Sequence, residues 1–241
     1  MKVISLFPDQ TEANRILSYC KKSFLTEDGS MITLEIDENS TSIHAKAIET
    51  LKETLKPLFL GKSHEITLPI AKAFCEVFPV NPGMVIFDAH PDADATYRTE
   101  DLLLGLIHKN LIKKENIILV GTRAWKPAEY KFIKKNNIKY FSMHEIAAEG
   151  LQEISESIMV VAKEFNALYI SIDMDVLDPA FAPGTNCPEP GGLTTRELLF
   201  FLKRLKKMHN LRAWDLSEID SKNDPGGKTA TVGAKIIAEL C

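Results

Sequence analysis

The sequence predicts an α/β fold of three layers (αβα), in which helices cover both faces of a mostly parallel central sheet. Short apolar segments of strand length alternate with longer segments of helical periodicity along most of the chain. The sequence contains no internal repeat, low-complexity segment or long linker. A length of 241 residues and a hydrophobic content of 45% allow a large core, so we expect a single domain over residues 1–241.

The expected strands and helices follow one another along the chain. We expect strands at Lys2–Phe7, Met31–Ile36, Pro57–Leu60, Met84–Asp88, Asn116–Val120, Ile138–Phe141, Ala167–Asp173 and Leu211–Leu216. We expect helices at Ser42–Leu55, Leu68–Val77, Asp101–Leu111, Pro127–Lys135, His144–Phe165, Thr195–Met208 and Thr229–Leu240. Two of the helix starts carry a capping signal. Ser42 precedes an apolar stripe and is a suitable N-cap, and Thr194 or Thr195, followed by Glu197, marks another start.

Composition and charge argue against several classes of protein. The net charge is -4 and no basic block stands out, so we expect no nucleic-acid partner. No apolar run approaches the length of a membrane span, and the N-terminus lacks the features of a signal peptide, so we expect a cytoplasmic protein without a membrane partner. The cysteines show no C-x-x-C spacing, which favours free thiols in a reducing compartment. They are Cys20, Cys75, Cys187 and Cys241.

The first candidate site follows the predicted strand at Met84–Asp88. Asp88, His90 and Asp92 occupy every second position after its apolar residues. Alternate side chains of an extended segment share one face, so these three can converge at the carboxyl end of the strand, where α/β sheets bind ligands. Taken alone, the triplet is equally consistent with a helix cap and a surface histidine.

A second strand end has the same character. The apolar strand at Ala167–Asp173 runs into Asp173 and Asp175, again carboxylates at alternate positions. Gathering four carboxylates without cations would be strongly repulsive, so the two strand ends together predict a shared pair of metal ions. Carboxylate and imidazole ligands suit a divalent ion such as Mn²⁺ better than a thiolate-bound zinc.

With these two motifs the chain resembles the ureohydrolases, the arginase and agmatinase family. The family signatures are G-G-D-H, D-A-H-x-D and S-x-D-x-D-x-x-D-P. This sequence has D-A-H-P-D at Asp88–Asp92 and S-I-D-M-D-V-L-D-P at Ser171–Pro179. The first signature is altered: His64 is present, but Lys62 and Ser63 replace the second glycine and the aspartate. The resemblance extends from about residue 56 to residue 241 and implies an arginase-like fold.

The resemblance also implies a chemistry and a set of ligands. Two Mn²⁺ ions would activate a bridging water that attacks a guanidinium carbon, releasing urea and an amine. One ion would be held by His64, Asp88, Asp92 and Asp173, and the other by His90, Asp88, Asp173 and Asp175. Asp92 would also orient the water. Glu218 maps to the family glutamate that faces the guanidinium, although a structural role for this carboxylate is the alternative. The family commonly forms trimers or hexamers, so we expect a homo-oligomer.

One expected catalytic group has no obvious counterpart. Arginases and agmatinases carry a His-Gly motif after D-A-H-x-D, and that histidine shuttles protons. The segment from Ala93 to Gly105 contains no histidine. His108 is therefore the candidate shuttle, and Glu100 or Asp101 could substitute for it as an acid/base group.

The residues expected around the substrate also depart from the arginase pattern. Lys126 stands where arginases place a carboxylate that meets the substrate's α-ammonium group, Arg98 lies in the loop after Asp92, and Asp94 replaces an asparagine. If Lys126 and Arg98 face the substrate rather than water, the tail of the substrate is negative or neutral rather than an α-ammonium group. We expect a hydrolase of a linear C–N bond outside peptides. Agmatine-like and other guanidino compounds lead as substrates, and a guanidino acid or a formimidoyl amino acid follows. A non-catalytic metal-binding relative is the competing hypothesis.

Overall fold

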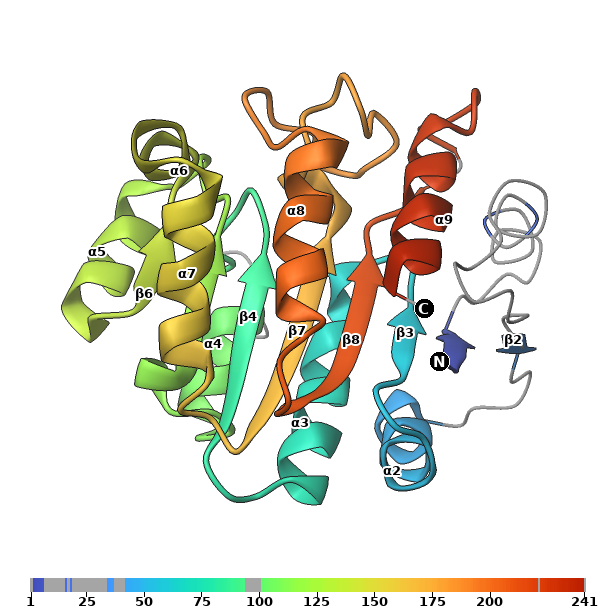
Figure 1. Cartoon of the computed structure of the whole chain (residues 1–241), viewed down its shortest axis with the longest axis vertical. Helices are drawn as coiled ribbons and strands as arrows, with labels where there is room; N and C mark the ends of the chain where they lie inside the picture. The colour runs from blue at the N-terminus through green and yellow to red at the C-terminus, as the bar shows by residue number, and fades with distance from the viewer. Residues whose placement is uncertain are drawn as a thin grey trace.

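A sheet of eight parallel strands runs through the molecule (Figure 1). The computed structural model describes residues 2–6, 16, 18, 34–36, 42–93, 101–220 and 222–240. Within these residues the strand order is β2-β1-β3-β8-β7-β4-β5-β6. The strands are β1 (Val3–Ser5), β2 (Leu34–Ile36), β3 (Leu58–Leu60), β4 (Pro82–Phe87), β5 (Ile117–Val120), β6 (Lys139–Phe141), β7 (Ala167–Asp173) and β8 (Leu211–Ser217).

Helices cover both faces of this sheet, which confirms the predicted three layers. They are α2 (Ile43–Glu53), α3 (Thr67–Val77), α4 (Leu102–His108), α5 (Pro127–Asn136), α6 (Met143–Glu149), α7 (Leu151–Ala162), α8 (Thr195–Leu205) and α9 (Lys228–Leu240). Figure 1 shows α7, α8 and α9 in front of the sheet and α3 behind it. Strand side chains alternate between the two faces. In β4, Val85 and Phe87 pack in the core under α7–α9, whereas Met84 and Ile86 pack in the core under α2–α4.

The carboxyl ends of the central strands are aligned, and this alignment positions the site. Four residues stand side by side in register across β3, β8, β7 and β4: Leu60, Leu216, Ile172 and Phe87. The chain leaves each of these strands at the same edge of the sheet. Side chains that follow the four strands are therefore brought together although they are far apart in the sequence.

Most predicted elements are present, but one helix was predicted wrongly. The stretch His144–Phe165 was expected to be continuous, whereas the structure divides it into α6 and α7 at Gly150. Gly150 has a φ of 88°, a conformation that glycine adopts without strain and that ends the first helix. The capping predictions are confirmed: Ser42 accepts a hydrogen bond from the Ala45 N–H, and Thr194 accepts one from the Glu197 N–H. Residues 31–33 and Phe7 of the predicted strands lie outside the described residues.

Among the described residues, no helix has the length and apolar character needed to cross a membrane.

Candidate metal centre and active-site cavity

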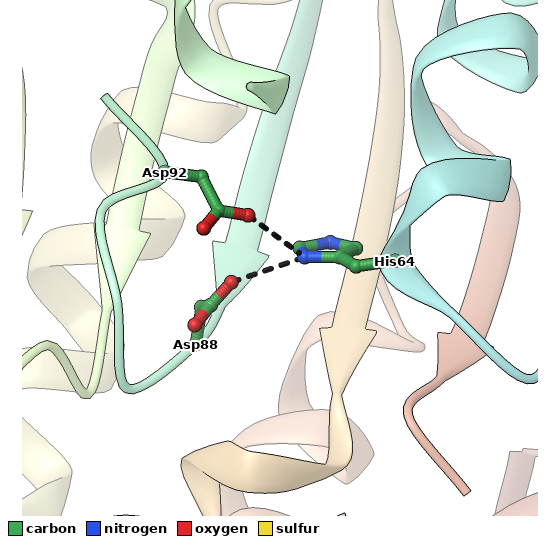
Figure 2. A group of neighbouring side chains, drawn as sticks. All are labelled: His64, Asp88 and Asp92. Atoms are coloured by element: carbon green, nitrogen blue, oxygen red, sulfur yellow. Dashed lines mark ion pairs between the residues drawn. The ribbon is translucent and has the colours of Figure 1, made fainter. Parts of the chain in front are cut away.

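The first half of the site is a histidine that faces three carboxylates. His64 begins the short 3₁₀ helix η1 (His64–Ile66), just after β3. Its Nδ1 lies 3.1 Å from an oxygen of Asp88, 3.2 Å from one of Asp92 and 3.2 Å from one of Asp173. Figure 2 shows the ring turned toward Asp88 and Asp92. In the described part of the chain this buried nitrogen makes no hydrogen bond of acceptable geometry.

The second half of the site shares a residue with the first. His90 Nδ1 lies 2.9 Å from Asp175 Oδ2 and 3.6 Å from Asp88 Oδ1. Asp88 thus directs Oδ2 toward His64 and Oδ1 toward His90. Two groups of possible metal ligands result, and Asp88 belongs to both: His64, Asp88 and Asp92, and Asp88, His90 and Asp175. A carboxylate with one oxygen in each group has the arrangement of a bridging ligand.

Local hydrogen bonds hold the carboxylates in these positions. Asp88 Oδ1 accepts the His90 N–H at 2.6 Å, and Asp173 Oδ1 accepts the Asp175 N–H at 2.8 Å. Asp175 Oδ1 in turn accepts the N–H of Ala89 at 3.1 Å, which connects the loops after β7 and β4. The i, i+2 spacing seen in the sequence therefore brings these carboxylates to one place and also fixes their orientation.

The electrostatics of the cluster show a surplus of buried negative charge. Burial, together with the nearby carboxylates of Asp175 and Asp92, raises the pKa of Asp88 to about 6. Burial likewise raises the pKa of Asp173 well above its usual range. Burial opposes charging of His90, yet the carboxylates of Asp175 and Asp88 outweigh it and raise the His90 pKa to about 11. The cluster therefore attracts positive charge, which protons or metal ions can supply.

The residues present fit a pair of divalent ions. An ion held about 2.1 Å from each of several ligands at right angles separates neighbouring ligand atoms by about 3.0 Å. The distances from His64 Nδ1 to the three carboxylates, 3.1 to 3.2 Å, are close to this value. Mixed imidazole and carboxylate donors suit first-row divalent metals.

Behind His64 lies a buried polar network that the sequence analysis missed. His64 Nε2 lies 3.1 Å from Ser171 Oγ, and the Ser171 hydroxyl donates to Asp215 at 3.0 Å. The hydroxyls of Thr67 and Tyr169 also donate to Asp215, which is fully buried. Because the Ser171 proton is directed to Asp215, its oxygen is left to accept a proton from Nε2. In a neutral ring, Nδ1 is then unprotonated and faces the carboxylates.

Glu218 lies beside the cluster, at the end of β8. Its φ of 60° is unusual for a residue other than glycine. Oε1 accepts the backbone N–H of His64 at 2.9 Å, and Oε2 accepts the side-chain Nδ2–H of Asn186 at 2.6 Å. An open cavity of about 1800 Å³ is lined by these residues and by the metal-ligand candidates, and Lys126, Trp125 and Asp101 also line it.

The structure does not bring every predicted site residue to this cavity. His108 is the last residue of α4, where its exposed ring packs edge-on against Phe132, and it does not line the cavity. The sequence alone could not show this, because the direction of the His108 side chain depends on how α4 packs, and α4 directs it toward Phe132. Asp94, Arg98 and Glu100 lie outside the described residues.

Arg123 is a further residue whose role no sequence pattern predicted. Its half-buried guanidinium donates hydrogen bonds to six backbone carbonyls: Gly121, Asp175, Val176, Leu177, Glu189 and Pro190. It thus connects the segment after β7, which carries candidate metal ligands, with the far end of the loop before α8. No short-range pattern marks such a residue, because its partners are carbonyls of distant segments.

The all-parallel αβα fold and the paired His/Asp groups at its strand ends define an α/β protein with a site able to bind divalent metal. The family model described as Arginase family matches residues 12–241. The arginase of Staphylococcus aureus is 30% identical over 224 residues, covering 84% of this chain and 73% of the relative. The guanidinopropionase of Pseudomonas aeruginosa is 34% identical over 193 residues, covering 76% of this chain and 59% of the relative.

A solved structure, that of arginase from Bacillus cereus, has the same fold. It superposes with a TM-score of 0.83 at 22% identity, covering 99% of this chain and 97% of that one. The chain belongs to the arginase family and is an arginase-family hydrolase. The predicted ureohydrolase family and the predicted fold are both confirmed.

Proposed function

We propose that the chain hydrolyses a linear guanidino or amidino C–N bond with the help of two Mn²⁺ ions, releasing urea and an amine from a guanidino substrate. The observation that carries this proposal is the position of Glu218. Its carboxylate lines the cavity beside two ligand groups that share Asp88. A carboxylate can accept two parallel N–H groups from a planar guanidinium, which would hold the reacting carbon next to the metal centre.

The chain's own residues have distinct parts in this reaction. His64, Asp88, Asp92 and Asp173 would hold one ion, and His90, Asp88, Asp173 and Asp175 the other. Bound ions at such a centre supply Lewis acidity and lower the pKa of water. Glu218 orients the guanidinium, and the His64 N–H keeps one oxygen of Glu218 in place.

Asp92 is the ligand candidate best placed to move a proton. Its side chain is 36% exposed, whereas that of Asp88 is 2% exposed. One of its oxygens faces His64. Within the described residues the other oxygen has no hydrogen-bond partner, so it can take a proton and pass it to the departing amine. The position of His108 does not support a part for that residue in the transfer.

The tail of the substrate is proposed to be neutral or anionic. Lys126 lines the cavity, and a lysine attracts a carboxylate but repels an ammonium group. The relative named guanidinopropionase supports a guanidino acid, whose tail is anionic. Agmatine-like compounds, whose tail carries an ammonium group, are the alternative guanidino substrates. A formimidoyl amino acid is the other amidino substrate that the site could accommodate.

A substrate panel tests the proposal. Protein loaded with Mn²⁺ is incubated with agmatine, L-arginine, 3-guanidinopropionate, 4-guanidinobutyrate and N-formimidoyl-L-glutamate. Urea is measured for the first four compounds and formamide for the last. We expect urea from at least one guanidino compound, with L-arginine not preferred. Release of neither product from any of them would favour a metal-binding relative without this activity.

Glu218→Gln tests the carboxylate itself. The substitution removes the charge but keeps the shape, so the KM for the guanidino substrate should rise or kcat should fall while metal content stays the same. Loss of one ion in this variant would instead make Glu218 a metal ligand.

Three further proposals are tested separately. Elemental analysis tests Mn²⁺ as the metal, light scattering tests a trimer or hexamer, and cell fractionation tests a cytoplasmic location.

A further inference from the structure

Both oxygens of Glu218 already have hydrogen-bond partners within the chain. The backbone N–H of His64 donates to Oε1 at 2.9 Å, and the Asn186 side chain donates to Oε2 at 2.6 Å. Asn186 lies 32 residues before Glu218 in the sequence, in the loop between β7 and α8, and it lines the same cavity. The two donors hold Glu218 from two different segments of the chain.

The loop that carries Asn186 is anchored on both sides of it. Before Asn186, the N–H of Gly184 donates to Thr229 Oγ1 at 2.7 Å at the start of α9. After Asn186, Arg123 donates to the carbonyl of Glu189 at 2.6 Å. The short segment between these anchors presents the Asn186 amide to Glu218. A side chain on an anchored loop can position its partner at a smaller entropic cost than one on a free loop.

We propose that Asn186 is a positioning residue that sets the plane of the Glu218 carboxylate, and thereby the preference of the site for a planar guanidinium. This inference rests on the proposed function. The last torsion of a glutamate side chain is broad, so the backbone alone does not fix the orientation of its carboxylate. A carboxylate has about four acceptor positions. The His64 N–H uses one acceptor position on Oε1, and the Asn186 amide uses one on Oε2. One acceptor position on each oxygen is then left for the two parallel N–H groups of a guanidinium.

Four variants test this role. Asn186→Ala removes the donor, and we expect the KM for the preferred guanidino substrate to rise about tenfold. We expect kcat to stay within about threefold and metal content to stay unchanged. Asn186→Asp keeps the shape but places a carboxylate against Glu218, so its effect should be larger. Asn186→Gln keeps an amide donor and should recover part of the loss. Asn136→Ala is the matched control, because Asn136 donates one comparable hydrogen bond, to the Phe132 carbonyl on α5.

A second readout does not depend on turnover. In ¹⁵N-labelled protein loaded with diamagnetic Mg²⁺, the amide proton of Asn186 that is bound to Glu218 should resonate downfield, and this shift should disappear in Glu218→Ala. An unchanged KM in Asn186→Ala, or an Asn186 signal that does not respond to Glu218→Ala, overturns the assignment. If the wild-type protein releases urea from no guanidino compound, the proposed function fails instead. The amide signal then decides alone whether Asn186 holds Glu218.

Discussion

Arg123 should contribute more to stability than any sequence pattern around it indicates. Its guanidinium ties together three segments: its own turn after β5, the residues after β7, and the end of the loop that leads to α8. Two of its hydrogen bonds are short, 2.7 Å to the carbonyl of Asp175 and 2.6 Å to that of Glu189. The first partner is the main chain of a metal-ligand candidate, so Arg123 should affect both folding and metal binding.

The magnitude follows from these contacts. A hydrogen bond from a charged donor is worth about 1.5–3 kcal/mol, and the two short bonds together would give about 3–6 kcal/mol. Arg123 is only half-buried, and water replaces part of what is lost. We therefore expect Arg123→Met to lower the free energy of unfolding by about 3 kcal/mol. Arg123→Lys keeps the charge but not the planar fork, so it should recover less than half of this loss.

Urea unfolding of the metal-free protein, followed by circular dichroism, measures the effect of Arg123 on stability. Chelator competition then compares the metal affinities of the same variants. The matched control is Arg212→Met. Within the described residues, the Arg212 side chain donates only to the nearby carbonyls of His209 and Leu211, so its loss should change stability by less than about 0.5 kcal/mol. Equal stability of the Arg123 and Arg212 variants would show that the carbonyl contacts of Arg123 are replaced by water without cost.

Three more outcomes follow from individual side chains. Asp88→Asn removes the charge shared by both ligand groups and should weaken the binding of both ions by about a hundredfold. Equilibrium dialysis measures this affinity, and binding of two ions at wild-type affinity would refute a shared ligand. Burial raises the pKa of Cys75 from 9.0 to about 12, so near pH 8 its thiolate fraction is about a thousandfold lower than that of a thiol with a pKa of 9.0. Alkylation of Cys75 should therefore be much slower than alkylation of the exposed Cys187, and mass spectrometry can map both. Comparable rates at the two cysteines would contradict this burial effect. Lys126→Ala should reduce kcat/KM for 4-guanidinobutyrate about tenfold and spare agmatine, whereas an equal loss for both would show that Lys126 does not face the tail.

The sequence was sufficient for the sheet and for the metal-ligand candidates because both depend on short-range patterns. Apolar runs of strand length predicted the strands, and the short spacing of Asp88, His90 and Asp92 after a strand marked them as ligand candidates. The expected extended backbone was wrong: the chain bends at Ala89 and His90, and Asp92 has a φ of 48°, so the three side chains approach one another through a turn. The break between α6 and α7 was missed because the helical pattern continues on both sides of Gly150, and a single glycine does not by itself end a helix. The positive φ of Gly150 in the structure shows that the chain turns there.

Residues that act through tertiary contacts could not be predicted in the same way. Asn186 meets Glu218 only because the loop before α8 folds back over the end of β8, and nothing within a few residues of Asn186 signals that contact. His108 shows the opposite case. A histidine near the expected position in the sequence is directed away from the cluster by the helix that carries it.

The orientation of His64 depends both on a short sequence pattern and on tertiary contacts. Its place after β3 fits a short motif, but its ring is set by Ser171 on β7 and, one hydrogen bond further, by Asp215 on β8. Ser171 and Asp215 stand opposite each other in the strand register, so correct pairing of β7 with β8 creates the contact. The pairing that builds the core therefore also turns Nδ1 of His64 toward the carboxylates. Metal binding and sheet formation should consequently be coupled in this chain, because His64, a candidate ligand, acquires its orientation only when the sheet has formed.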